Sequence, residues 1–199
     1  RMGASGHTCT IQDISIVNIA GNHATQATAA KRPLLRNDGV NNYLAFDGVD
    51  DGLATASIDF TSTDKMSVFS GVRKISDVTT GVYFETSGDA SVNAGAIRLS
   101  SPSTSAATTY GFTFRGTTSI SQGSVSPFSA PVTNVLTTIV DGAQSGLANQ
   151  VKARVNGSLQ VLSVGSNGDI VGSMGNYVTY VGTRNGAWPL NGRIYSMIV

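Results

Sequence analysis

The chain has 199 residues, of which 40% are hydrophobic and 13% are charged, and its formal net charge at pH 7 is +1. This near-neutral charge, with no basic cluster beyond Lys31-Arg32, argues against a nucleic-acid partner, and no run of about 18 apolar residues is present that could span a membrane. The single cysteine, Cys9, excludes an internal disulfide and a cysteine-based zinc site. The length fits one large domain, and 23 glycines favour short strands joined by tight turns.

Much of the chain alternates between apolar and polar residues, and a period of two predicts β-strands. The alternation is clearest at 150–156, where Val151, Ala153 and Val155 form the apolar face. The segment 134–141 is rich in Val, Ile and Thr, and we predict a strand that is covered on both faces. In chain order, strands are predicted at 11–20, 43–46, 66–74, 81–86, 96–100, 110–116, 134–141, 150–156, 159–164, 177–182 and 191–199.

Three segments lack the alternation and are predicted to be loops. Pro33 disfavours helix at the residue before it, so 21–37 is predicted to be a long ordered loop. The segment 57–64 forms a second loop. The Ser-rich segment 117–131 is the longest polar connection, and its length suits a rim loop or an interaction surface.

Turn signals separate the predicted strands at short intervals. Asn156-Gly157 is the strongest hairpin signal, because Asn and Gly both tolerate a positive φ. Roughly a dozen short strands, no convincing helix and no internal repeat predict an all-β fold, with two antiparallel sheets packed as a β-sandwich or jelly roll. We predict a lead-in segment at 1–10 and a single domain at 11–199, and both ends suggest a piece of a longer polypeptide or one with trimmed tails.

An acidic turn follows the predicted strand at 43–46. Asp47-Gly48 is a strong turn dipeptide, and two adjacent carboxylates, Asp50 and Asp51, come directly after it. Calcium takes about six to eight oxygen ligands, and these three aspartates could supply part of such a set. The alternative is structural, with Asp47 and Asp51 accepting hydrogen bonds from amides of their own turn. Both interpretations are open, and the structural one is favoured.

Five segments carry a resemblance to a known family. They are 44–51 (LAFDGVDD), 63–73, 151–160 (VKARVNGSLQ), 181–196, and the stretch 24–33 that precedes the acidic turn. In this order and spacing they resemble the laminin G-like domains of the concanavalin A-like lectin and glucanase superfamily. The stretch before the acidic turn is similar to a variant common in phage and prophage virion proteins.

The resemblance implies a jelly-roll sandwich of the concanavalin A-like type. Domains of this family often bind glycans or proteins, some hold one calcium ion at the rim, and a minority are glycosidases or lyases. Members often carry an aromatic residue at the position of Gly52, so the resemblance implies that a stacking residue is missing from this rim.

A turn-rich loop near the end of the sequence contains the only tryptophan. Trp188 lies in the stretch RNGAWPLNG together with Arg184 and Asn185. An exposed indole ring could stack on a pyranose and bury its CH groups, while the planar polar side chains bind hydroxyls. These three residues are the predicted ligand-binding site. The alternative is that Trp188 closes one end of the sandwich and contacts no ligand.

Catalytic constellations are not recognisable in the sequence. Glu85 is the only glutamate, so the paired-glutamate active strand of the superfamily's glycosidases is absent. His7 lies in the lead-in and His23 in a predicted loop, and no G-x-S-x-G nucleophile elbow accompanies them. We therefore predict a module that is not an enzyme and has no catalytic residues.

The predicted function is that of a phage virion or surface module, such as a fibre, tail or capsid-decorating domain, located on a virion or outside the cell. Its partner would be a glycan or host-surface receptor, or neighbouring virion subunits, including further copies of the chain in a homo-oligomer. Calcium on the acidic turn is the one cofactor considered. Two alternatives stay open. One is a polysaccharide-cleaving glycosidase or lyase, which would need a carboxylate pair or a Tyr/His–Arg cluster in a groove, and the other is a purely structural, self-assembling domain.

Overall fold

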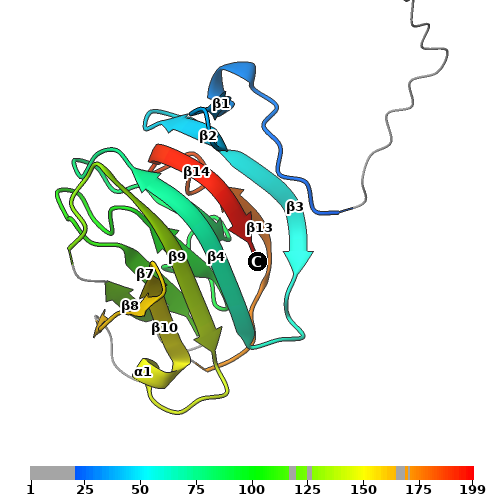
Figure 1. Cartoon of the computed structure of the whole chain (residues 1–199). Helices are drawn as coiled ribbons and strands as arrows, with labels where there is room; N and C mark the ends of the chain where they lie inside the picture. The colour runs from blue at the N-terminus through cyan, green and yellow to red at the C-terminus, as the bar shows by residue number, and fades with distance from the viewer. Residues whose placement is uncertain (1–20, 117–119, 125–126, 165–168, 170) are drawn as a thin grey trace, which may run out of the picture.

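Two antiparallel β-sheets of seven strands each pack face to face in the computed structural model (Figure 1). The structure describes residues 21–116, 120–124, 127–164, 169 and 171–199. The first sheet has the strand order β1-β2-β14-β4-β9-β10-β11, and the second has the order β12-β8-β7-β6-β5-β13-β3. The predicted all-β sandwich is therefore confirmed.

The strands of the first sheet are β1 (Leu34–Asn37), β2 (Asn42–Asp47), β4 (Lys65–Lys74), β9 (Val132–Asp141), β10 (Val151–Val155), β11 (Ser158–Leu159) and β14 (Asn191–Ile198). Those of the second sheet are β3 (Leu53–Asp59), β5 (Val82–Thr86), β6 (Ile97–Ser100), β7 (Gly111–Arg115), β8 (Ile120–Ser124), β12 (Ser163–Val164) and β13 (Asn176–Val181). The described helices are the short 3-10 turn η1 (Ala29–Lys31) and the single turn α1 (Leu147–Gln150).

Apolar side chains of the two sheets meet in one core. On β4 the side chains of Met66, Val68 and Val72 point inward, and on β7 Phe112 and Phe114 do the same. Because successive residues of a strand point to opposite sides, the remaining side chains form an outer face on each sheet.

Three of the predicted loops contain strands. β1 lies inside the predicted loop 21–37, β3 extends into the predicted loop 57–64, and β8 lies within 117–131. β1 has no alternating pattern because all four of its residues are exposed at the edge of the first sheet, so neither face has to be apolar.

The prediction that 134–141 is covered on both faces is wrong. Leu136 and Val140 of β9 are buried, but Val135 is 57% exposed on the outer face. The Val- and Thr-rich composition of this strand reflects its central place in the sheet, between β4 and β10, rather than two covering layers.

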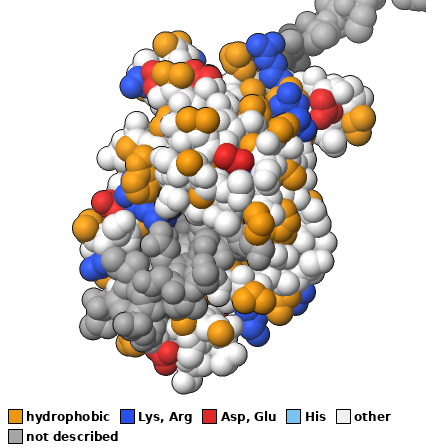
Figure 2. All heavy atoms as spheres, turned by 90° about the vertical axis from the view of Figure 1, so that its left-hand side faces the viewer, with side chains coloured by type: hydrophobic (Ala, Val, Ile, Leu, Met, Phe, Trp, Pro, Cys, Tyr) orange, Lys and Arg blue, Asp and Glu red, His pale blue; other side chains and the backbone are white. Residues whose placement is uncertain are grey.

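The lead-in 1–10, with His7 and Cys9, and the predicted strand 11–20 lie outside the described residues. Among the described helices none has the length and hydrophobicity to cross a bilayer. On the side of the molecule drawn in Figure 2, hydrophobic side chains form small separate groups rather than one continuous patch, and charged side chains are few.

Candidate functional site

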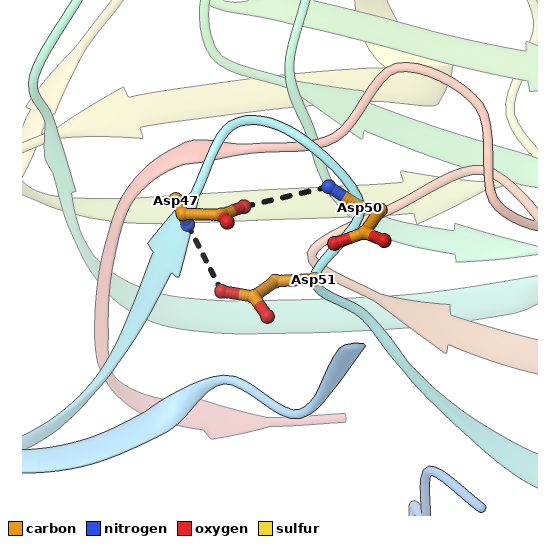
Figure 3. Close-up of side chains that lie close together, drawn as sticks. All are labelled: Asp47, Asp50 and Asp51. Atoms are coloured by element: carbon orange, nitrogen blue, oxygen red, sulfur yellow. Dashed lines mark hydrogen bonds between the residues drawn. The ribbon is translucent and has the colours of Figure 1, made fainter. Parts of the chain in front are cut away.

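The acidic turn is held together by its own carboxylates (Figure 3). Oδ1 of Asp47 accepts hydrogen bonds from the backbone amides of Val49, at 2.8 Å, and Asp50, at 3.4 Å. Oδ2 of Asp51 accepts one from the backbone amide of Asp47, at 3.0 Å. The structural interpretation of Asp47 and Asp51 is therefore confirmed.

The same turn brings three carboxylates together. Asp47, Asp50 and Asp51 each offer an oxygen within 4.8 Å of the others. Asp51 is only 6% exposed, and burial, together with the neighbouring carboxylates, raises its pKa. Calcium takes carboxylate oxygens as ligands, so these three donors fit part of the ion's coordination shell. Calcium on these residues is a prediction to be tested below.

Gly52 follows the acidic turn and packs against Thr183, which belongs to the loop that contains Trp188. A Cβ atom added at Gly52 would overlap the side chain of Thr183, so no aromatic residue fits at this position. A hollow of about 310 Å³ lies between the turn and the loop, and Asp50, Thr183 and Asn185 contribute to its lining. The two predicted sites are thus neighbours at one end of the sandwich.

Trp188 belongs to the loop 182–190 between β13 and β14, which we call the Trp188 loop. The indole is 39% exposed and lies over two guanidinium groups. Cζ of Arg184 is 4.1 Å from the ring centroid and Cζ of Arg98 is 4.9 Å from it. Trp188 has a φ of 51°, a strained value for a residue other than glycine, so the surrounding loop holds it in place. The ring therefore forms an outer cover over buried cations rather than a plug in the core.

Arg184 is buried and forms ion pairs with two acidic side chains. Its Nε lies 2.9 Å from Oε2 of Glu85, and its Nη2 lies 3.0 Å from Oδ1 of Asp89. Glu85 is completely buried, and this burial raises its pKa even though Arg184 favours the charged form. Burial also acts on Asp89, but the amide of Ser91 and the Arg184 guanidinium outweigh it and lower the pKa of Asp89. Asn185, the third predicted ligand-binding residue, is exposed beside them.

Arg98 of β6 lies on the outer face of the second sheet. In the sheet it pairs with Glu85 of β5 on one side and with Thr113 of β7 on the other. The neighbours of these residues along each strand point into the core. Arg98 is 5% exposed, and its Nη2 donates a hydrogen bond of 3.0 Å to Oγ1 of Thr113. Among the described residues, no hydrogen-bond acceptor faces its Nε or Nη1. Buried donors without an acceptor are rare because each loses the hydrogen bonds that water would give it.

We call this group the arginine cluster; its members are Glu85, Asp89, Arg98, Arg115, Arg184 and Trp188. Arg115 joins it through a 2.6 Å hydrogen bond from Nη1 to the carbonyl of Ser91. Two guanidinium groups, those of Arg98 and Arg184, therefore face the carboxylates of Glu85 and Asp89. Burial, and the charge of Arg184, lower the pKa of Arg98, as expected for a cation without full compensation. The donors of Arg98 that lack an acceptor among the described residues favour an anionic partner.

Sequence reasoning found Trp188 and Arg184 but missed Arg98 and Asp89. No motif marks either residue, because their partners come from segments far away in the chain. Glu85 and Arg184, for example, are separated by 99 positions. Only an arginine in an otherwise apolar strand, AIRLS, could have served as a signal.

The fold was compared with known proteins. No family model matches the chain, and no curated protein matches its sequence. Among solved structures, the native heptameric SAP-like pentraxin of Limulus polyphemus is 11% identical with a TM-score of 0.53, over 77% of this chain and 72% of the pentraxin. Domains LG4–5 of the mouse laminin α1 chain are 14% identical with a TM-score of 0.51, over 83% of this chain and 44% of the laminin fragment. A carbohydrate-binding module of a Ruminococcus gnavus IT-sialidase, bound to α2,3-sialyllactose, is 16% identical with a TM-score of 0.48, over 73% of this chain and 89% of the module.

At these identities the similarity concerns the fold. The neighbours are concanavalin A-like sandwiches, and laminin G-like domains are among them. The fold predicted from the resemblance is confirmed. The link to the phage and prophage variant rests on the sequence resemblance.

Proposed function

We propose that the domain is a carbohydrate-binding module without enzymatic activity, and that it holds a carboxylate-bearing glycan against the arginine cluster. One observation carries the proposal: the buried guanidinium of Arg98 has two donors without an acceptor among the described residues, directly beneath the half-exposed ring of Trp188. A sugar acid matches this pair, because its ring has an apolar CH face and its carboxylate oxygens accept charge-assisted N–H bonds.

Trp188 has two roles in this proposal. Its ring covers Arg98 in the free protein, and it becomes the stacking platform when the side chain turns aside to admit the carboxylate. The cost of moving the ring is offset by the charge-assisted hydrogen bonds of Nε and Nη1.

The arginine cluster contains a carboxylate pair with oppositely shifted pKa values, which is the pattern of a glycosidase. Its geometry favours binding instead. Glu85 is completely buried, and both of its oxygens are bonded to Arg184, with Oε1 also accepting a 2.6 Å hydrogen bond from the amide of Ala90. A general acid needs a free proton-transfer position facing the glycosidic oxygen, and Glu85 has none.

The proposed location is a virion or another extracellular surface, and the proposed partner is a host-surface glycan. This part of the proposal is supported by the sequence resemblance and by the low charge of the chain. Attachment to neighbouring virion subunits is the alternative use of the same fold.

A glycan array with acidic and neutral glycans tests the proposal. We expect binding to carboxylated glycans, and about tenfold weaker binding by Trp188→Ala, because loss of the aromatic platform removes about 1–2 kcal/mol. Phe69→Ala is the matched control: Phe69 is 44% exposed but lies on the outer face of the other sheet. Equal binding of carboxylated glycans by the Trp188 variant and the wild type contradicts the proposal, and so does a preference for neutral glycans that is lost in Trp188→Ala. Release of reducing sugar from any bound glycan contradicts the non-enzymatic assignment.

A further inference from the structure

A second concave surface lies on the outer face of the first sheet, on the opposite side of the core from the arginine cluster. It is a groove of about 500 Å³. Gly71 of β4 and Ser196 of β14 lie at its floor, since they are direct neighbours in the sheet. The turn between β1 and β2, with Asp38 and Asn41, contributes one wall, and Asn156 contributes to the other. We call it the Gly71 groove.

Gly71 lies opposite a register shift of β14, which falls between Ile194 and Ser196. It lies inside the ten-residue strand β4. A Cβ atom added there would lie 3.4 Å from Oγ of Ser196 and 3.4 Å from Cβ of Tyr195, which are ordinary contacts. Glycine in a strand interior marks a bulge or a place where a ligand or another backbone approaches closely, and valine or alanine would fill the space above it. The missing side chain leaves the floor of the groove open.

The walls of the groove are held in position by hydrogen bonds. Oδ1 of Asp38 accepts bonds from the amides of Val40 and Asn41, and these bonds lower its pKa, so the carboxylate is charged at neutral pH. Asn156 is fixed at both ends of its amide, accepting from the amide of Val135 at 2.9 Å and donating to Oδ1 of Asn134 at 2.8 Å. Side chains that are already ordered lose little entropy when a ligand binds.

The lining combines one ring, one cation and one anion. Tyr195 packs against Tyr43 with 5.4 Å between the ring centroids. Arg73 donates one hydrogen bond of 3.2 Å, from Nη1 to Oγ1 of Thr133. Asp38 also contributes to the lining, so its charge and that of Arg73 cancel. The groove thus suits an uncharged ligand with hydroxyl donors and acceptors around an apolar ring face, which is the chemistry of a neutral sugar.

We propose that the Gly71 groove is a second binding site and that it takes a neutral saccharide unit. It is independent of the arginine cluster, because the two lie on the outer faces of different sheets. A domain with one site on each outer face can bridge two glycan chains, and this goes beyond the function proposed above.

Saturation-transfer NMR with the methyl glycosides of glucose, galactose, mannose and N-acetylglucosamine at millimolar concentration tests the inference. We expect transfer to at least one glycoside. Gly71→Val should weaken that binding at least tenfold without unfolding the protein, since valine fits the strand and fills the floor of the groove. Ser67→Val is the matched control, because Ser67 points to the same outer face of β4 but is not part of the groove.

The outcomes separate this inference from the proposed function. Unchanged binding by Trp188→Ala and by Ser67→Val, with loss in Gly71→Val, supports the second site. Absence of transfer to all four glycosides overturns it, as does binding that survives Gly71→Val or disappears in Trp188→Ala. A change in sedimentation coefficient caused by Gly71→Val also overturns it, because the groove would then be an interface between copies of the chain. Loss of glycoside binding in Trp188→Ala would place the neutral sugar at the arginine cluster, and the other outcomes do not bear on whether carboxylated glycans bind at Arg98.

Discussion

The acidic turn and the arginine cluster are both rich in charged groups, but they satisfy those groups differently. In the turn, the carboxylates of Asp47 and Asp51 accept hydrogen bonds from backbone amides that lie no more than four positions away. In the cluster, partners come from three strands and two loops, and Arg98 still has two donors without an acceptor among the described residues. A local turn can satisfy its polar groups with its own backbone, whereas a site assembled from distant segments can keep hydrogen-bond donors for a ligand.

The strongest test of this difference removes Arg184. In Arg184→Ala the fully buried Glu85 loses the partner of both of its oxygens, so we expect a loss of about 3–5 kcal/mol in the free energy of unfolding. Lys65→Ala is the control, because it breaks the exposed Lys65–Asp141 pair and should cost only about 0–1 kcal/mol. Chemical denaturation measures both. Equal costs for the two variants would show that the cluster contributes no more than a surface ion pair.

A second test concerns the contact between the Trp188 loop and the acidic turn. Gly182 has a φ of 78°, and a Cβ atom there would overlap the ring of Phe46, the residue before Asp47. We expect Gly182→Ala to cost about 2–4 kcal/mol, from backbone strain and overpacking together. Gly157→Ala isolates the strain, since Gly157 has a φ of 82° and nothing within 4 Å, and it should cost about 1 kcal/mol. If the two variants lose the same stability, the loop and the turn do not pack tightly.

Local patterns were sufficient to predict much of the fold. The alternation at β4, β7 and β10 and the Asn156-Gly157 turn depend on neighbouring residues only, and the structure confirms them. β1 could not be predicted because an exposed edge strand has no apolar face. Within the candidate site, Trp188 stood out as the single tryptophan, while Arg98 became recognisable only when the strand register placed it beside Glu85 and Thr113.

The smallest expected effect is that of the Asp51 charge on the stability of the acidic turn. The pKa of Asp51 is raised in the folded state, so protonation of Asp51 stabilises the fold. This contribution to the free energy of unfolding is fully present below the unfolded pKa, about 3.9, and is lost as the pH rises through the folded pKa. Asp51→Asn keeps an oxygen acceptor for the amide of Asp47 and removes the charge. Without calcium, we expect this variant to raise the melting temperature at pH 7 by about 2–4 °C, and to match the wild type near pH 3.5.

Calcium should reverse the order of the melting temperatures of the wild type and Asp51→Asn. If Asp47, Asp50 and Asp51 hold the ion, millimolar calcium raises the melting temperature of the wild type but not of Asp51→Asn. Magnesium serves as the control ion, because it is smaller and gives up its water reluctantly. A wild-type melting temperature that does not respond to calcium would leave the carboxylates a purely structural role.

The central claim is that Arg98 recognises a carboxylate beneath Trp188, and calorimetric titration tests it most directly. The ligand is the acidic glycan that binds best on the array, compared with the same glycan after reduction of its carboxyl group to an alcohol. The account predicts at least tenfold tighter binding of the carboxylate form, and loss of this preference in a folded Arg98→Gln variant, because a neutral amide cannot make the charge-assisted bonds of a guanidinium. Equal affinity for the two forms, or a preference that survives in Arg98→Gln, would contradict it.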